Sequence, residues 1–164
     1  MPTLFVIGRI LLVVIFAISG FNKLMDINGT AQAISTQVPI PEMFAGWAAQ
    51  LEAATGMATP KLLAIAGAVI ELGAALMIAF NFGTRFAAAL LILFTAAVTI
   101  YFHDFWTMQG AERMQNLVQA QKNLSLIGGL LMLFALGSWR PYSVTRVEYI
   151  SPAARDERYP HPAE

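Results

Sequence analysis

Four long apolar runs are the feature of this 164-residue sequence that most limits what it can fold into. They cover residues 4–21, 62–80, 86–102 and 124–136. A membrane-spanning helix needs about 20 residues, with a range of roughly 17–25, and three of the runs satisfy this directly. The fourth run satisfies it when the amphipathic residues from Met114 onward are included. Only helices and closed barrels can cross a bilayer, and these runs are continuous rather than alternating, so the sequence predicts an all-α membrane protein.

The composition agrees with a chain that is solvated mainly by lipid. Charged residues make up 12% of the sequence and apolar residues 57%, whereas a soluble domain carries roughly 25% charged residues. The formal net charge is zero, so the basic surface of a nucleic-acid-binding protein is absent. The sequence has no cysteine and two histidines, which argues against disulfides, iron–sulfur clusters and metal sites. We therefore expect no nucleic-acid partner, no metal and no covalent cofactor.

The connections between the runs set the predicted topology. The spanning helices are expected at about 4–24, 61–80, 85–102 and 114–137, which together form one transmembrane domain over residues 1–137. The link at 81–85 is very short, so the second and third helices form an antiparallel hairpin. The prediction is an antiparallel four-helix transmembrane bundle.

Two further segments lie outside the spanning helices. A long loop is predicted at 25–61, divided by Pro39 and Pro41 because proline removes a helix donor and favours extended backbone before it. Within it, apolar side chains recur every three or four residues over 41–55. This spacing predicts a short helix at the membrane interface or capping the bundle, with a structured loop as the alternative. Residues 138–164 contain four prolines and mixed charges, so this polar tail is expected to be partly disordered.

The orientation in the membrane follows from the basic residues near the helix ends. Four crossings place both termini and the 81–85 link on the same side. That side carries five Lys and Arg residues outside the apolar runs, and the other side carries four. Because basic residues favour the cytoplasm, both termini are expected there. The first run also resembles a cleavable signal peptide, but residues 4–7 are apolar where a signal peptide should be polar.

Two charged residues fall inside the apolar runs. Arg9 lies near the start of the first run, and Glu71 lies at the midpoint of the second. A charge at the centre of a spanning helix costs about 2.5–3.5 kcal/mol on insertion scales, so each needs a partner. Counted from the cytoplasmic ends at about 1.5 Å per residue, their depths differ by roughly 6 Å. We therefore expect an intramembrane ion pair between Arg9 and Glu71, which either only fixes helix packing or has a functional role.

Polar and aromatic residues gather at the other ends of the helices and form a candidate ligand-binding rim. Its members are Asn22, Lys23, His103, Asp104, Trp106, Lys122 and Asn123. Such residues are also ordinary interfacial anchors. As a binding site, His103 could exchange a proton near neutral pH, aromatic rings would form flat walls, and Lys122 and Asn123 would donate hydrogen bonds to a carbonyl. This chemistry suits a quinone head group or another planar carbonyl compound.

Six short motifs, taken in order, resemble the DoxX family. They are Gly8-Arg9, Ser19-Gly20-Phe21-Asn22-Lys23-Leu24, Glu71, Thr84-Arg85, His103-Asp104-Phe105-Trp106 and Lys122-Asn123. The resemblance spans about residues 8–137. It implies a small four-helix protein of the bacterial inner membrane, similar to subunits of quinol oxidase and thiosulfate:quinone oxidoreductase assemblies or to membrane partners of oxidative-stress enzymes. The long segment at 25–61 and the tail depart from the family pattern and are candidate docking surfaces.

Three functions are compatible with this sequence. The first is a membrane subunit of a quinone-linked redox system, an oxidoreductase subunit with no redox centre of its own and with no catalytic residue assigned. The second is a non-enzymatic scaffold or accessory subunit of a larger membrane complex. The third, a small-solute carrier, ranks last because no internal repeat or broken helix is evident. The expected partners are the lipid bilayer and other protein subunits, and pairs of small residues leave a homo-oligomer open.

Overall fold

The computed structural model describes residues 2–137, which form six helices. The helices are α1 (Pro2–Met25), α2 (Ile27–Gln37), α3 (Glu42–Thr55), α4 (Thr59–Ala79), α5 (Thr84–Phe102) and α6 (Gly110–Leu136). Four of them, α1, α4, α5 and α6, are long and apolar enough to cross a membrane. The all-α fold with four spanning helices is therefore confirmed. The tail at 138–164, including its predicted disorder, lies outside the described residues.

The long loop predicted between the first two spanning helices is not confirmed, because two helices occupy most of that segment, one of them over the residues where a short helix was one of the two alternatives. The first of them, α2, begins after Asp26, whose side chain accepts a hydrogen bond from the backbone N–H of Gly29 at 2.9 Å. An aspartate at this position satisfies a donor that the first helical turn leaves free. The second helix, α3, follows Pro41 and ends at Gly56, which has a left-handed φ of 68°.

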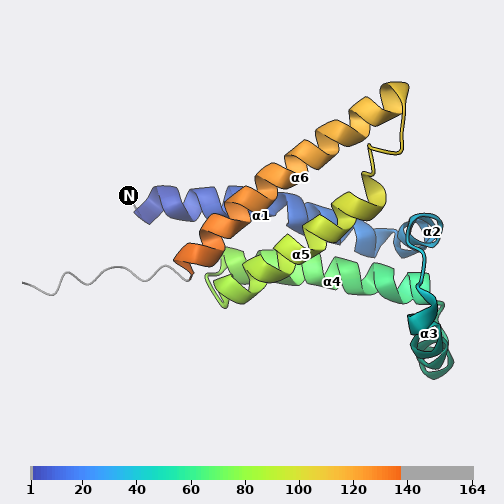
Figure 1. Cartoon of the computed structure of the whole chain (residues 1–164). Helices are drawn as coiled ribbons and strands as arrows, with labels where there is room; N and C mark the ends of the chain where they lie inside the picture. The colour runs from blue at the N-terminus through green and yellow to red at the C-terminus, as the bar shows by residue number, and fades with distance from the viewer. Residues whose placement is uncertain (1, 138–164) are drawn as a thin grey trace, which may run out of the picture.

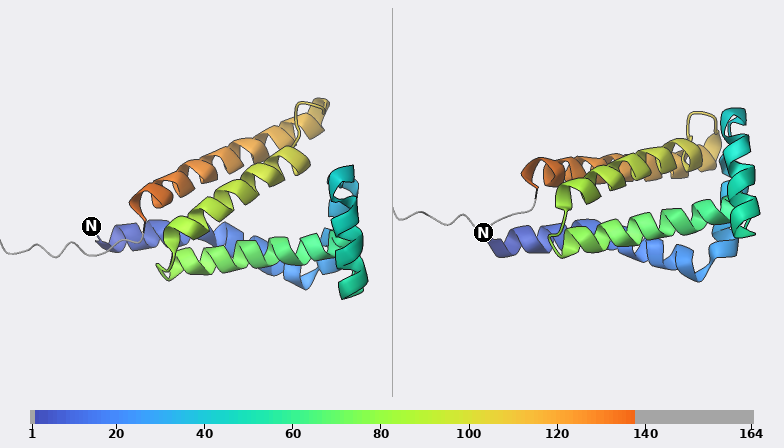
Figure 2. Two further views of the ribbon diagram at one scale, coloured as in Figure 1. Left: turned by 60° about the horizontal axis from the view of Figure 1, so that its bottom comes forward. Right: turned by 90° about the horizontal axis from the view of Figure 1, so that it is seen from below.

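Helix α3 lies across one end of the bundle, roughly perpendicular to α4 (Figures 1 and 2). None of its residues is buried, and its apolar side chains, including Trp47 at 70% exposure, remain uncovered within the described chain. The Glu52 carboxylate accepts a hydrogen bond from the backbone N–H of Thr59 at 2.6 Å, which lowers the pKa of Glu52. This link between α3 and α4 is fully present above the ordinary pKa of Glu52 and is lost as the pH falls through the lowered pKa. The segment is therefore helical, and its contact with lipid stays a prediction.

The spanning helices pack as two pairs. Helix α1 packs along α4 and α5 packs along α6, while the turn after Ala79 joins α4 to α5. Figures 1 and 2 show that the two pairs diverge toward the end that carries α2 and α3. The buried core lies at the closed end and is built mainly from small or branched side chains: Val13, Phe16, Ala74, Ala75, Ile78, Ala87, Ala88, Leu91, Leu130 and Leu133. The opposite end, where the two pairs diverge and which carries α2 and α3, is called the open end.

Gly20 sets the register between α1 and α4. A Cβ atom at this position would lie 2.8 Å from the backbone nitrogen of Leu72 and 2.9 Å from the carbonyl oxygen of Ala68. Small residues allow such close approach of helix backbones in a membrane. The contact places the end of α1, with Ser19 and Lys23, beside the middle of α4.

Candidate functional site

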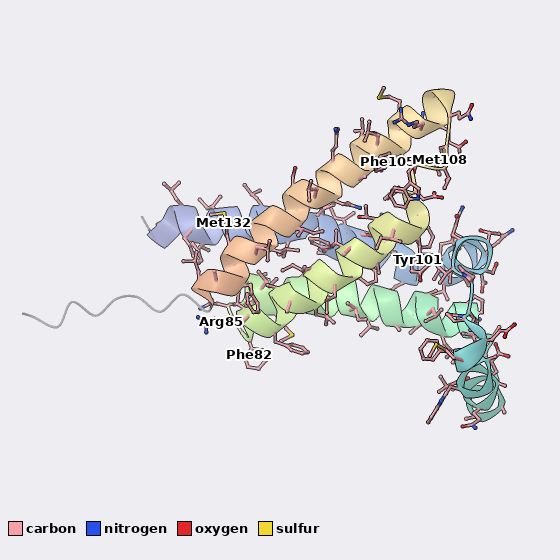
Figure 3. All side chains as sticks on the ribbon, in the orientation of Figure 1. Phe82, Arg85, Tyr101, Phe105, Met108 and Met132 are labelled. Atoms are coloured by element: carbon pink, nitrogen blue, oxygen red, sulfur yellow. The ribbon has the colours of Figure 1, made fainter. Side chains whose placement is uncertain are left out.

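A cavity of about 680 Å³ lies at the open end of the bundle. Side chains from α1, α2, α4, α5 and α6 line it, and most of them are apolar or aromatic, as are Phe16, Phe94 and Tyr101. Tyr101 lies at the end of α5 that is nearer α2, as Figure 3 shows. Small-molecule sites have volumes of about 300–1,000 Å³ and combine apolar walls with a few polar groups. The size and lining of this cavity match those of a ligand site.

An ion pair between Lys23 and Glu71 lies on the cavity wall. The Lys23 ammonium donates to Glu71 Oε2 at 2.5 Å and to Ser19 Oγ at 2.8 Å, and it lies 5.6 Å from the centre of the Phe94 ring. Ser19 and Lys23 share one face of α1 because they are four residues apart. The side chain of Glu71 is 6% exposed and that of Lys23 is 27% exposed. This pairing is what allows both charges to lie within the spanning helices.

The predicted pair between Arg9 and Glu71 is wrong. Within the described residues Glu71 pairs with Lys23, while Arg9 donates to Asn81 Oδ1 at 2.6 Å and to the carbonyl oxygen of Ala79 at 3.1 Å. The depth count assumed that the start of the first apolar run, at Leu4, and the end of the second, at Phe80, lie at the same level. In the structure Arg9 is level with the end of α4, and it lies ten residues before Ser19, or about 15 Å along the helix.

Arg9 stabilises the end of α4. Its guanidinium binds the Ala79 carbonyl, one of the oxygens that a helix terminus leaves without a partner, and it holds Asn81, which has a left-handed φ of 59°. At the same end of the bundle Arg85 donates to the carbonyl oxygen of Ala135 in α6 at 3.3 Å; Figure 3 labels this residue. Both arginines are therefore explained by helix termination rather than by the cavity.

We expect Arg9→Ala to lower the free energy of unfolding by about 1–3 kcal/mol, because half-buried acceptors at the end of α4 lose a charged donor. Arg9→Lys should recover part of the loss. The change is measured by denaturant unfolding in detergent micelles, followed by circular dichroism. Combining Arg9→Ala with Glu71→Gln should give the sum of the two single effects, and a strong interaction energy between them would contradict this assignment.

His103 lines the cavity where α5 ends. Its Nδ1 atom lies 3.0 Å from Asn116 Oδ1, and Asn116 donates through Nδ2 to the carbonyl oxygen of Glu112 at 3.2 Å. Since Asn116 presents its oxygen, Nδ1 of His103 carries the hydrogen. In the neutral imidazole Nε2 is then left as an acceptor.

Asn123 and Lys122 line the cavity from α6. Asn123 is buried and donates to Thr99 Oγ1 at 2.9 Å, while Thr99 donates to the Thr95 carbonyl oxygen at 2.7 Å. Lys122 is exposed and donates to Gln119 Oε1 at 2.6 Å. Asn123 is thus fixed by its neighbours, whereas Lys122 has a flexible side chain with further hydrogens to donate.

Three members of the predicted rim do not line the cavity. Asn22 is exposed on α1, next to Lys23 in the chain but on a different face of the helix. Asp104 accepts a hydrogen bond from Thr107 Oγ1 at 2.6 Å, in the turn between α5 and α6. Trp106 is 55% exposed and packs edge-on against Phe105, with ring centres 5.2 Å apart. The structure therefore brings together Lys23, His103, Lys122 and Asn123 from the predicted rim.

Sequence reasoning missed two parts of the cavity. It placed Glu71 with Arg9 and did not include Ser19, although the spacing of Ser19 and Lys23 already puts both on one helix face. It also missed the wall from α2, which contributes Thr30, Ala33 and Ile34. No pattern in the sequence pointed to this wall, because α2 was not predicted as a helix.

Comparison with known proteins agrees with this architecture. The family model described as DoxX matches residues 4–104, which include Lys23, Glu71 and His103. The inner membrane protein YphA of Escherichia coli (strain K12) is 34% identical over 136 residues, which are 83% of this chain and 84% of that protein. No solved structure matches this chain. The chain belongs to the DoxX family.

Proposed function

We propose that this protein is an inner-membrane subunit of a quinone-linked redox system and binds a quinone-like planar compound in its cavity. The observation that carries the proposal is the Lys23–Glu71 ion pair, which lies in a mostly apolar cavity between membrane-spanning helices. Charged residues within spanning helices are rare and commonly mark binding sites or proton pathways. The proposed location agrees with the printed name of the relative YphA, an inner membrane protein of Escherichia coli.

The chemistry of the cavity suits a planar carbonyl compound that reaches the protein through lipid. Phe94, Tyr101 and Phe102 offer aromatic surfaces for the faces of a ring. Lys23 and Lys122 offer ammonium donors for the carbonyl oxygens at its edges. Partly exposed apolar residues such as Ile15 and Leu63 also line the cavity and would contact an apolar tail.

Electron transfer in this proposal involves another subunit. The sequence contains no cysteine, so this chain supplies neither thiols nor iron–sulfur ligands. The role of this chain is to bind the ring and to hold or exchange protons at its oxygens, through His103, Lys122 and Asn123 together with the Lys23–Glu71 pair.

A second candidate is an accessory subunit that docks a partner protein without binding a ligand. The exposed apolar face of α3, with Met43, Phe44, Trp47 and Leu51, favours this alternative. Exposed apolar side chains clustered on one helix face commonly mark interaction sites. The ligand-binding experiment below separates the two candidates.

The proposal is tested by titrating a short-chain ubiquinone analogue into the full-length protein in lipid nanodiscs, with calorimetric detection and empty nanodiscs as the reference. We expect saturable binding of one molecule per chain. Lys122→Ala and His103→Ala should each weaken it about tenfold, the loss of one charge-assisted or well-oriented hydrogen bond.

Arg113→Ala is the matched control, because Arg113 is a basic residue of the same helix that does not line the cavity. It should leave the affinity unchanged. If the heat measured with the protein equals the heat of partition into empty nanodiscs, and shows no saturable component, the result would contradict ligand binding and favour the accessory role.

A further inference from the structure

The Lys23–Glu71 pair, whose two residues line the cavity, has hydrogen-bonding capacity left. Within the described residues Glu71 accepts one hydrogen bond, through Oε2, and its Oε1 atom accepts none. Lys23 uses two of its three hydrogens, on Ser19 and Glu71. The pair therefore offers one charged acceptor and one charged donor next to each other, and both residues line the cavity.

A carbonyl oxygen and a hydroxyl group satisfy these two atoms differently. A carbonyl accepts from Lys23 but brings its lone pairs close to the unpartnered oxygen of Glu71. A hydroxyl accepts from Lys23 through its oxygen and donates its hydrogen to Glu71 Oε1. Since an ionised carboxylate only accepts hydrogen bonds, the hydroxyl is the better match.

We infer that the cavity prefers the dihydroxy, two-electron-reduced form of its ring ligand over the dicarbonyl form, and that Glu71 is the residue that makes this distinction. The inference rests on the proposed function. His103 also lines the cavity and contacts Asn116 through Nδ1, which leaves Nε2 available for the other hydroxyl of such a ring. Leaving a buried acceptor without a partner costs free energy. The dicarbonyl form has no hydrogen to donate to Glu71, so it should bind more weakly than the dihydroxy form.

The test compares the affinities of a short-chain ubiquinone analogue and of the same compound reduced chemically, measured under anaerobic conditions on the full-length protein in nanodiscs. We expect the reduced compound to bind about tenfold more tightly, as one hydrogen bond to a charged group provides. In Glu71→Gln the ratio should fall to about one, because the amide both donates and accepts.

Glu42→Gln is the control, since Glu42 is an exposed carboxylate on α3 that does not line the cavity. The ratio of the affinities for the reduced and the oxidised compound should be the same in this variant as in the wild type. Equal binding of the two forms by the wild-type protein would overturn this inference and leave the proposed function standing. Absence of saturable binding by either form would overturn both. If Glu71→Gln does not fold, the wild-type ratio still decides whether the cavity prefers the reduced form.

Discussion

Replacing Lys23 by alanine is expected to lower the free energy of unfolding by about 3–5 kcal/mol, because it removes the ion-pair partner of a carboxylate that is buried inside the membrane-spanning region. Glu71 is 5% exposed and has no other basic partner within the described residues. The measurement is unfolding in detergent micelles by added denaturant, followed by circular dichroism. This is the largest single effect that the structure predicts for a charged residue.

Lys122→Ala is the matched control for this prediction. Lys122 also lines the cavity, but it is exposed and its only hydrogen bond within the described residues is to Gln119. A surface substitution of this kind should change the free energy of unfolding by less than about 0.5 kcal/mol. Removing both Lys23 and Glu71 should recover much of the loss, since no buried charge then remains. Equal, small effects of the two lysine substitutions would contradict the pairing.

Gly20→Ala is expected to destabilise the protein by about 1–3 kcal/mol, because the added methyl group meets backbone rather than a movable side chain. The Cβ atom would lie 2.8 Å from the Leu72 nitrogen and 2.9 Å from the Ala68 oxygen, so α1 and α4 must separate to make room. The same unfolding measurement detects the change. Separation of these helices should also weaken the Lys23–Glu71 contact, which depends on their register.

Gly8→Ala provides a control of opposite sign on the same helix. A Cβ atom at Gly8 meets nothing within 4 Å. Alanine has a higher helix propensity than glycine, by about 1 kcal/mol, so this variant should be at least as stable as the wild type. If both glycine variants gained stability, the close approach of α1 and α4 at Gly20 would be excluded.

The spanning helices could be predicted from the sequence because each depends on one property of a continuous segment. An apolar run of about 20 residues has few alternatives to a spanning helix. Helix α2 lacks such a property, because the helix is short and mixes polar with apolar residues. Its main local signal is the capping side chain of Asp26. Most of its stability comes from packing beside α4, which the sequence of the segment does not reveal.

The ion pair could not be predicted correctly, because it depends on the register between two helices. Counting residues from the ends of the apolar runs gave Arg9 as the partner of Glu71. The actual register follows from the backbone contact at Gly20, which brings Lys23 to Glu71 and leaves Arg9 at the end of α4. A depth estimate of this kind fails when one helix extends beyond its neighbour.

The candidate rim could be predicted in part. Helix ends that share one side of the membrane bring Lys23, His103, Lys122 and Asn123 to one cavity. Neighbours in sequence do not follow automatically, because successive residues of a helix point about 100° apart. Asn22 therefore lies on another face, and the hydrogen bond from Thr107 holds Asp104 within its own turn.

The charge state of Glu71 tests most directly whether Lys23 and Glu71 form an ion pair, on which the proposed site and its ligand preference depend. It is measured by infrared difference spectroscopy between the wild-type protein and Glu71→Gln in lipid, with Glu42→Gln as the control for an exposed carboxylate. In Glu71→Gln we expect carboxylate stretching bands of the wild-type protein to be lost. In Lys23→Gln we expect the same bands to shift. A protonated-carboxyl band in the wild type that disappears in Glu71→Gln would contradict the account.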